Sequence, residues 1–203
     1  MKLPDLRTQL FDAQTWVSDL VAGTAADQFE LPTPCTEFTV TGLIEHLFGV
    51  QLRVLAYATE RAVGDTPSTV PLTSTDPTEI AGQLRDLAEQ GRRAWAEWSV
   101  EELQSQSVTA PFGSVPGAAA LGIMTSENLV HGWDLAVATG QPSEADPPTA
   151  TMLLAMMQRA LPAEPRGGDA IPFAAPVTAA ADAGPTERLA AWTGRSRPVR
   201  LHS

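Results

Sequence analysis

Thiols, imidazoles and amines are scarce in this chain of 203 residues, which holds one cysteine, three histidines and one lysine. Its single cysteine, Cys35, cannot form an internal disulfide, and proteins of that kind usually reside in a reducing compartment. Long apolar runs are missing as well, because none approaches the about 20 residues that span a bilayer. The N-terminal segment 1–5 lacks the apolar core of a signal peptide. We therefore expect a cytoplasmic protein with no membrane partner.

Positive charge is scarce too, since the formal net charge is −11 and Lys2 is the only lysine. A nucleic-acid surface needs clustered lysine and arginine to neutralise phosphates, so no nucleic-acid partner is expected. Apolar residues make up 43% of the chain, which is too many for a disordered protein. A chain of this length can bury one sizeable core. Composition thus indicates a globular domain and leaves its function open.

What the sequence does contain is the spacing of amphipathic helices. Apolar residues recur every three to four positions, which predicts helices over 5–22, 39–62, 77–99, 118–139, 149–161 and 186–192. Thr39 and Asp76 are typical N-caps, and Gly23 and Gly140 are typical C-caps. The pattern predicts an all-α fold in which the longer helices form a bundle.

The segments between these helices are rich in helix-breaking residues. Prolines in 31–38 favour extended geometry and predict a structured loop. Segment 64–75 is a Pro/Ser/Thr-rich connection, and 108–117 is expected to be irregular or briefly extended and to fold back over the bundle. After Pro162 the composition shifts to alanine, proline and glycine. We therefore divide the chain into a helical bundle, 1–161, and a C-terminal extension, 162–203, that packs on the bundle.

The histidines point to a candidate metal site. His202 lies in the C-terminal tail, which leaves His46 and His131 within predicted helices. Glu127 precedes His131 by four residues, so both side chains leave one face of the 118–139 helix. His46 shares an apolar stripe with Leu43 and should point inward. Two imidazoles and a carboxylate suit zinc or a similar first-row divalent ion with an open coordination position.

Each candidate residue also has a simpler interpretation. A histidine on an apolar helix face is often only hydrogen-bonded in the core, and a Glu-x-x-x-His pair adds about 0.2–0.5 kcal/mol to any helix. Cys35 is either a soft ligand or reactive thiol near the site, or a small buried hydrophobe. Asp134 either orients an imidazole or makes a capping or inter-helix hydrogen bond. A buried glutamate beside two imidazoles nevertheless needs a cation or protons, which favours metal.

Several strings of residues resemble a known family. Segments 33–35, 38–40, 43–47 and 127–141 are similar to the actinobacterial metal-binding branch of the DinB/YfiT-like proteins, and segment 187–195 matches their usual ending. That branch is related to the N-terminal domain of mycothiol-dependent maleylpyruvate isomerase. The resemblance implies a DinB-like four-helix bundle with a long crossover, here followed by an extra C-terminal helix and an irregular tail.

The resemblance also implies a function. His46, Glu127 and His131 match the three residues that hold a divalent metal in that family, with zinc expected first and nickel second. Members with known activity use the metal to bind a low-molecular-weight thiol such as mycothiol as a thiolate. The isomerase carries a separate C-terminal domain that contributes to its active site, and the residues after 140 are too few to supply that domain.

Three hypotheses follow. The first is an enzyme, a mycothiol-dependent transferase or isomerase-like protein that uses a small-molecule thiol and an unidentified second substrate. The second is a non-catalytic metal- or ligand-binding bundle, in which Cys35 or another side chain would close the fourth metal position. The third is a metal-free helical interaction protein, in which His46 and His131 would bond backbone groups. The sequence leaves open whether the protein is a homodimer.

Overall fold

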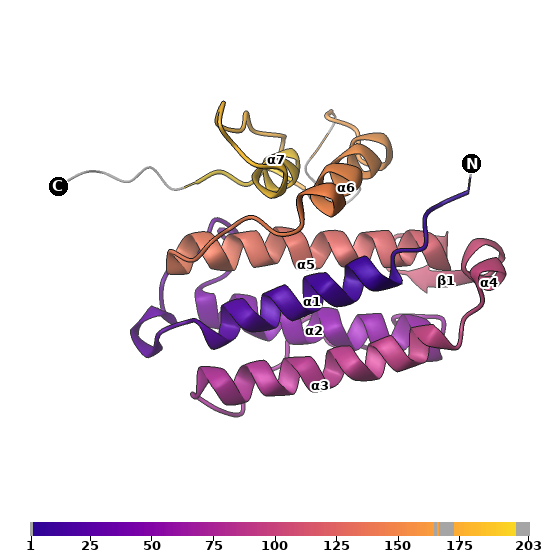
Figure 1. The fold of residues 1–203 in the computed structure, drawn as a ribbon, viewed down its shortest axis with the longest axis horizontal. Coiled ribbons are helices and arrows are strands. Elements are labelled where there is room, and N and C mark those ends of the chain that lie inside the picture. The colour runs from indigo at the N-terminus through magenta and orange to yellow at the C-terminus, as the bar shows by residue number, and fades with distance from the viewer. Residues whose placement is uncertain (1, 165, 167–172, 198–203) are drawn as a thin grey trace.

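Four long helices form the body of the protein. A computed structural model describes residues 2–164, 166 and 173–197, and in it α1 (Arg7–Ala22), α2 (Val40–Thr59), α3 (Pro77–Ala96) and α5 (Gly117–Thr139) lie lengthwise beside one another (Figure 1). α1 and α2 each pack against both α3 and α5, so the order around the bundle is α1, α3, α2, α5. The predicted all-α bundle is confirmed.

These helices begin where their capping residues predict. The Thr39 hydroxyl accepts a hydrogen bond from the Gly42 amide at 3.3 Å, and the Asp76 carboxylate accepts one from the Thr78 amide at 2.9 Å. Gly140 ends α5 in the left-handed conformation that its predicted C-cap role requires. None of the helices that the structure describes has the length and apolar character needed to cross a bilayer.

A long crossover joins α2 to α3. These two helices run in the same direction (Figure 1). Segment 60–76, which connects them, therefore has to run back along the length of the bundle. Glu45 fastens it to α2: its carbonyl accepts from the Val70 amide at 3.0 Å and its carboxylate from the Leu72 amide at 3.3 Å. Gly49 allows this close approach, because a Cβ there would collide with the Ser68 carbonyl. The crossover therefore lies directly over the middle of α2.

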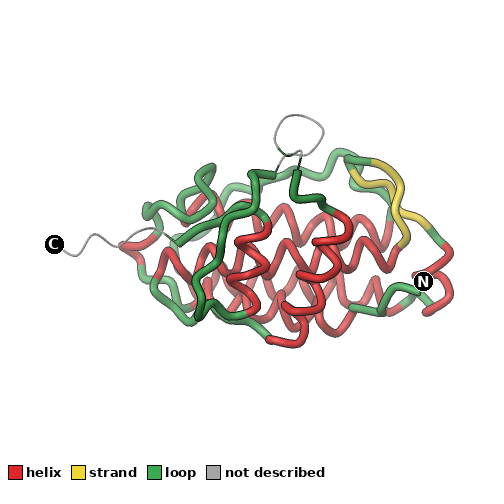
Figure 2. The backbone as a smooth tube through the Cα atoms, turned by 90° about the horizontal axis from the view of Figure 1, so that it is seen from above, coloured by secondary structure: helices red, strands yellow, loops and turns green. Residues whose placement is uncertain are grey.

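The chain between α3 and α5 is more regular than the sequence predicts. α3 ends at Ala96, and Ser99 starts a short helix, α4 (Val100–Ser105), through a capping box with Glu102. Strands β1 (Ser107–Ala110) and β2 (Gly113–Pro116) then pair antiparallel across a two-residue turn at 111–112. Figure 2 shows this hairpin in yellow at one end of the bundle. The predicted extended segment is thus a hairpin, and the helix expected to end near Ser99 ends at Ala96, because Ser99 caps the next helix instead.

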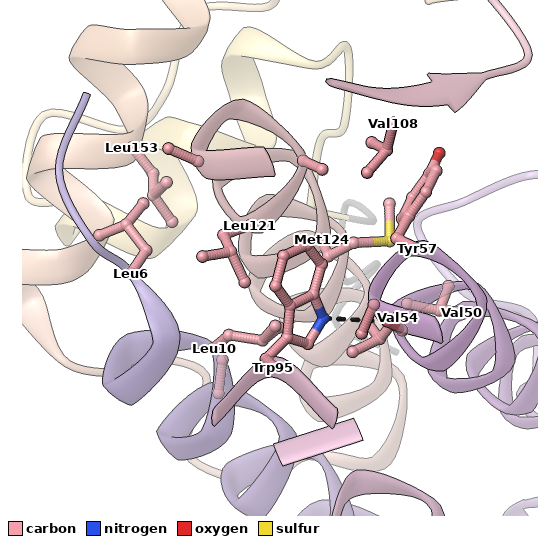
Figure 3. Close-up of a cluster of buried hydrophobic side chains, with 14 of the residues drawn as sticks. Leu6, Leu10, Val50, Val54, Tyr57, Trp95, Val108, Leu121, Met124 and Leu153 are labelled. Carbon is pink, nitrogen blue, oxygen red and sulfur yellow. Dashed lines mark hydrogen bonds between the residues drawn. The ribbon is translucent and has the colours of Figure 1, made fainter. Parts of the chain in front are cut away.

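The core consists of two apolar clusters. One surrounds Trp95, Leu121 and Met124 and is drawn in Figure 3, where the Trp95 indole donates to the Val54 carbonyl at 2.9 Å. The other joins Val17, Val40, Leu43, Ile44 and Leu47 to α3 and to the end of α5.

A chain of buried amides links three of the helices through this core. Gln14 of α1 donates to Gln51 of α2 at 2.5 Å, and Gln51 donates to Asn128 of α5 at 2.9 Å. Because each of these amides has a hydrogen-bond partner, their burial is compatible with a stable interior. This network of amides fixes the rotation of α5 about its own axis at Asn128, the residue next to Glu127.

The last two helices of the chain pack on α5. α6 (Pro147–Ala160) and α7 (Pro185–Trp192) contact each other and α5, on the side of α5 away from α3 (Figure 1). The Glu144 carboxylate accepts from the Thr186 and Glu187 amides at 2.9 and 3.2 Å, which satisfies free N–H groups at the start of α7. A short 3-10 helix, η1 (Ala26–Gln28), completes the described elements. The division at residue 161 stays a prediction, and His202 lies outside the described residues.

Candidate metal centre

Three side chains from two helices converge where the sequence predicts a metal site. Glu127 and His131 lie one turn apart on α5, and His46 lies opposite them on α2. The Nε2 atoms of His46 and His131 are 3.8 and 3.5 Å from the same Glu127 oxygen, Oε2. The two imidazole ring centroids are 4.8 Å apart. The structure therefore brings the predicted residues together, and metal binding by them stays a prediction.

The Nδ1 atom of each imidazole lies beside a hydrogen-bond acceptor that is not one of the three candidate ligands. His46 Nδ1 lies 3.0 Å from the Ser68 carbonyl of the crossover, and His131 Nδ1 lies 3.2 Å from Asp134 Oδ2. A carbonyl or carboxylate only accepts hydrogen bonds, so in each neutral ring Nδ1 carries the hydrogen and Nε2 keeps its lone pair. This arrangement is typical of histidines that bind metal through Nε2. Asp134 thus has the orienting position that its spacing suggested.

The charges of the site are strongly coupled. Burial alone would raise the pKa of Glu127, but hydrogen bonds from His131 and His46 bring it well below its usual range. Burial alone would lower the pKa of His131, but hydrogen bonds to Asp134 and Glu127 overcome burial and raise it to about 9. Without an ion, a proton on His131 therefore balances the Glu127 carboxylate, as expected where a buried charge needs a partner.

The geometry fits a first-row divalent ion. Ligand atoms about 2.0–2.1 Å from a tetrahedral ion are about 3.4 Å from one another. The three candidate atoms all lie within 4.8 Å of one another, and the two distances to Glu127 are only slightly longer than that ideal. A contraction of a few tenths of an ångström would bring each imidazole Nε2 atom to that ideal separation from the Glu127 oxygen. This mixed nitrogen and oxygen donor set suits zinc or nickel.

A second group of polar side chains lies on the opposite edge of the His131 ring. Cys35, His131 and Asp134 also lie close enough to share an ion. An arginine already holds the cationic position there: Arg195 Nε is 3.5 Å from Asp134 Oδ2, and Arg195 Nη2 is 3.7 Å from Cys35 Sγ. Burial raises the pKa of the Cys35 thiol, and Arg195 only partly opposes this. Cys35 is therefore a protonated thiol beside the site.

The loop before α2 covers one side of the site. Phe38 stacks on the His46 ring with centroids 5.1 Å apart and planes 23° from parallel. Phe38 of this loop therefore lies over the His46 ring. The stacking contact restrains the face of the His46 ring, and the hydrogen bond to the Ser68 carbonyl restrains its Nδ1 edge.

Access to the site comes from another direction. A cavity of about 640 Å³ reaches Glu127 and His131 between α5, the hairpin turn at 111–112 and the end of α6. Phe173, Thr193 and Arg195 of the C-terminal extension also line it. These residues of the extension supply one wall of the cavity.

Sequence reasoning missed several of these residues. Ser68 acts through its backbone carbonyl, and no side-chain pattern could have revealed it. Arg195 ends the 187–195 string that resembles the family, so a signal for it was present. Phe112 stands in a segment expected only to be irregular or extended, and its position at the cavity depends on the hairpin turn.

The sequence of this chain is similar to that of known proteins. Residues 10–136 match the model of the mycothiol maleylpyruvate isomerase N-terminal domain family. Two uncharacterised proteins from two strains of Mycobacterium tuberculosis are each 34% identical over 188 residues, covering 91% of this chain and 94% of theirs.

Solved structures show the same fold. The crystal structure of the mycothiol-dependent maleylpyruvate isomerase aligns with a TM-score of 0.51 at 20% identity, covering 75% of this chain and 68% of that one. A histidine-to-alanine mutant of that isomerase gives a TM-score of 0.50 at the same identity and coverage. At this identity the likeness concerns the fold alone.

Proposed function

The chain belongs to the mycothiol maleylpyruvate isomerase N-terminal domain family, and from this premise we propose that it is a metal-dependent enzyme that activates a low-molecular-weight thiol. In this proposal His46, Glu127 and His131 hold one divalent ion, zinc or nickel. Mycothiol is the proposed thiol, because a solved relative is mycothiol-dependent and the curated relatives come from Mycobacterium tuberculosis. The reaction is of the transferase or isomerase type.

One observation carries the proposal. Two imidazoles are bound at Nδ1 from outside and direct both Nε2 atoms at one carboxylate oxygen. A pair of merely structural histidines needs no such convergence. Among the described residues, no lysine or arginine forms an ion pair with Glu127, so the carboxylate has no fixed cation of its own. A divalent ion would satisfy all three groups at once.

The three residues would leave the bound ion receptive to an anion. Two neutral imidazoles and one carboxylate reduce a dipositive charge to about +1, which favours an anionic fourth ligand. When bound, the ion supplies the Lewis acidity that lowers the pKa of a thiol. Cys35 lies on the other edge of the His131 ring beside Arg195, so the protein's own thiol does not occupy that position. The cavity that reaches Glu127 and His131 provides room for an external thiol.

The alternative of a closed, non-catalytic metal site has weaker support. It requires a fourth protein ligand, and Cys35 was the candidate for that role. Arg195 already lies 3.7 Å from Cys35 Sγ and 3.5 Å from Asp134 Oδ2, so its positive charge opposes a metal ion at that edge. The cavity at Glu127 and His131 likewise favours an open position.

The test combines metal analysis with thiol titration. Protein purified without an affinity tag should contain one divalent ion per chain by elemental analysis. Isothermal titration of the metal-loaded protein with mycothiol should show binding that chelation abolishes and that Glu127→Gln weakens. Glu101→Gln, which alters an exposed carboxylate of α4, should leave binding unchanged. Equal thiol binding by metal-free and metal-loaded protein would refute the proposed role of the ion.

A further inference from the structure

The cavity beside the candidate metal centre has an apolar lining. Six large apolar side chains face it from four parts of the chain: Phe112, Ile123, Val130, Met157, Leu161 and Phe173. They come from the hairpin turn, α5, the end of α6 and the segment before α7. Its volume of about 640 Å³ lies within the range of small-molecule sites, roughly 300–1,000 Å³. From this lining we infer that the cavity binds a small ligand with an uncharged, apolar body.

The charges at the cavity support an uncharged body. Arg195 is the only lysine or arginine among the described residues that line it. Its three nitrogens are directed at Asp134, the Thr193 carbonyl and Cys35, at 3.5, 3.1 and 3.7 Å. A buried carboxylate needs a cation or several hydrogen-bond donors. A small diacid would bring two negative charges, whereas Arg195 already balances the buried Asp134 and no other lysine or arginine is present among the described lining residues.

The mouth of the cavity is apolar as well. Phe112 stands at the hairpin turn with 69% of its surface exposed, although it lines the cavity. Because this ring both lines the cavity and is exposed, it lies where the cavity opens to solvent. The hairpin itself is fixed to the crossover, because the Thr109 amide donates to the Arg61 carbonyl at 2.8 Å and the Val63 amide donates to the Thr109 carbonyl at 3.1 Å. The backbone of the hairpin is therefore held beside the crossover, and it carries Phe112 at the cavity mouth.

The position of the cavity assigns a role to the ligand. Glu127 and His131 also line the cavity, so a ligand that fills it lies beside the proposed metal. This inference rests on the proposed function in one respect: it identifies the apolar ligand as the second substrate that meets the activated thiol. The class of ligand follows from the lining alone.

A fluorescent probe tests the class of ligand without metal or thiol. N-phenyl-1-naphthylamine is uncharged and apolar, and its emission rises when it leaves water. Titrated into chelator-treated protein, it should show saturable binding at one site. Phe112→Asp should weaken that binding about tenfold or more, because a charge at the mouth disfavours an apolar ligand. Val100→Asp is the matched control, since Val100 is 59% exposed and lies outside the cavity lining; its Kd should stay within about twofold of wild type.

Two further measurements complete the test. Leu161→Asp, which places a charge deeper in the cavity, should also weaken binding in protein whose circular dichroism is unchanged. Maleate, a small diacid, should not displace the probe. Non-saturable binding, a Phe112→Asp variant that binds as well as Val100→Asp, or displacement by maleate would overturn the inference. Failure of the metal and thiol titrations with intact probe binding would instead refute the proposed function and the substrate role, and would leave the apolar site standing.

Discussion

The two edges of the His131 ring have opposite electrostatic arrangements. At Nε2 the ring faces Glu127 and His46, and no fixed cation pairs with that carboxylate among the described residues. At Nδ1 the ring faces Asp134, whose carboxylate lies 3.5 Å from Arg195 Nε. Both edges offer metal-ligand atoms at suitable separations. The number of ligand atoms therefore does not distinguish the two edges. The positive charge of Arg195 does, because it disfavours a metal ion at the Nδ1 edge and leaves the Nε2 edge as the metal site.

Removal of the shared ring should have the largest effect. His131→Ala leaves one imidazole and one carboxylate, which rarely hold a first-row ion against dilution. We expect the variant to be purified without metal, as measured by elemental analysis. Cys35→Ser, which alters only the Nδ1 edge, should retain one ion per chain. Full metal content in His131→Ala would show that the ligand set is wrong.

The next largest effect concerns pH. The pKa of His131 is about 9 in the metal-free fold, above its ordinary value, so the protonated ring stabilises that fold. This contribution is complete below about pH 6.5, the ordinary pKa of histidine, and disappears as pH rises through about 9. A metal ion must displace the same proton. The metal Kd should therefore fall about tenfold per pH unit between roughly 7 and 9 and level off above that range.

A competitive chelator titration at several pH values would measure this slope. Proton NMR of the His131 ring in the metal-free protein would measure its pKa independently. Glu127→Gln removes one of the two carboxylates that raise the pKa, so the pH at which the slope levels off should move lower. A metal Kd independent of pH would contradict the coupling between His131 and its neighbours.

Asp134 tests the outer support of the ring. Asp134 is fully buried, and its Oδ2 holds His131 Nδ1 at 3.2 Å. Asp134→Asn keeps the shape of the side chain and removes its charge, so the ring is oriented less firmly. Loss of such a partner typically costs about 10–100-fold in metal affinity, and we expect a loss near the lower limit because the three ligands remain. An unchanged Kd would show that the Nδ1 edge has no part in metal binding.

The sequence predicted the residues whose roles depend on local spacing. Glu127 and His131 could be paired because four residues are one helical turn, and His46 because it shares the apolar stripe of Leu43. The capping box of α4 was also visible as Ser99 followed by Glu102 three residues later, although the sequence analysis did not use it.

The residues that were missed depend on tertiary packing. The Ser68 carbonyl reaches His46 only because the crossover lies against Gly49. Arg195 reaches Asp134 only because α7 packs on α5. Contacts between elements distant in the chain leave no periodic pattern in a single sequence, so they had to come from the structure.

Substitution of Cys35 should change the metal affinity least. The size of that change shows which edge of the His131 ring binds the ion. Its Sγ could join His131 and Asp134 as a ligand set, in which case Cys35→Ser would abolish binding. We expect instead a metal Kd within about twofold of wild type, because Arg195 already supplies the cation at that edge and its charge opposes a metal ion there.

Cobalt substitution distinguishes these outcomes directly. A thiolate bound to cobalt gives a near-ultraviolet charge-transfer band. The cobalt protein should lack this band both as wild type and as Cys35→Ser, because neither would hold the ion through a protein thiolate. Added mycothiol should produce the band equally in both, since the open position on the Nε2 edge accepts an anionic soft ligand. A band present in the wild type before any thiol is added, and lost in Cys35→Ser, would move the metal site to the Nδ1 edge and leave no role for an external thiol.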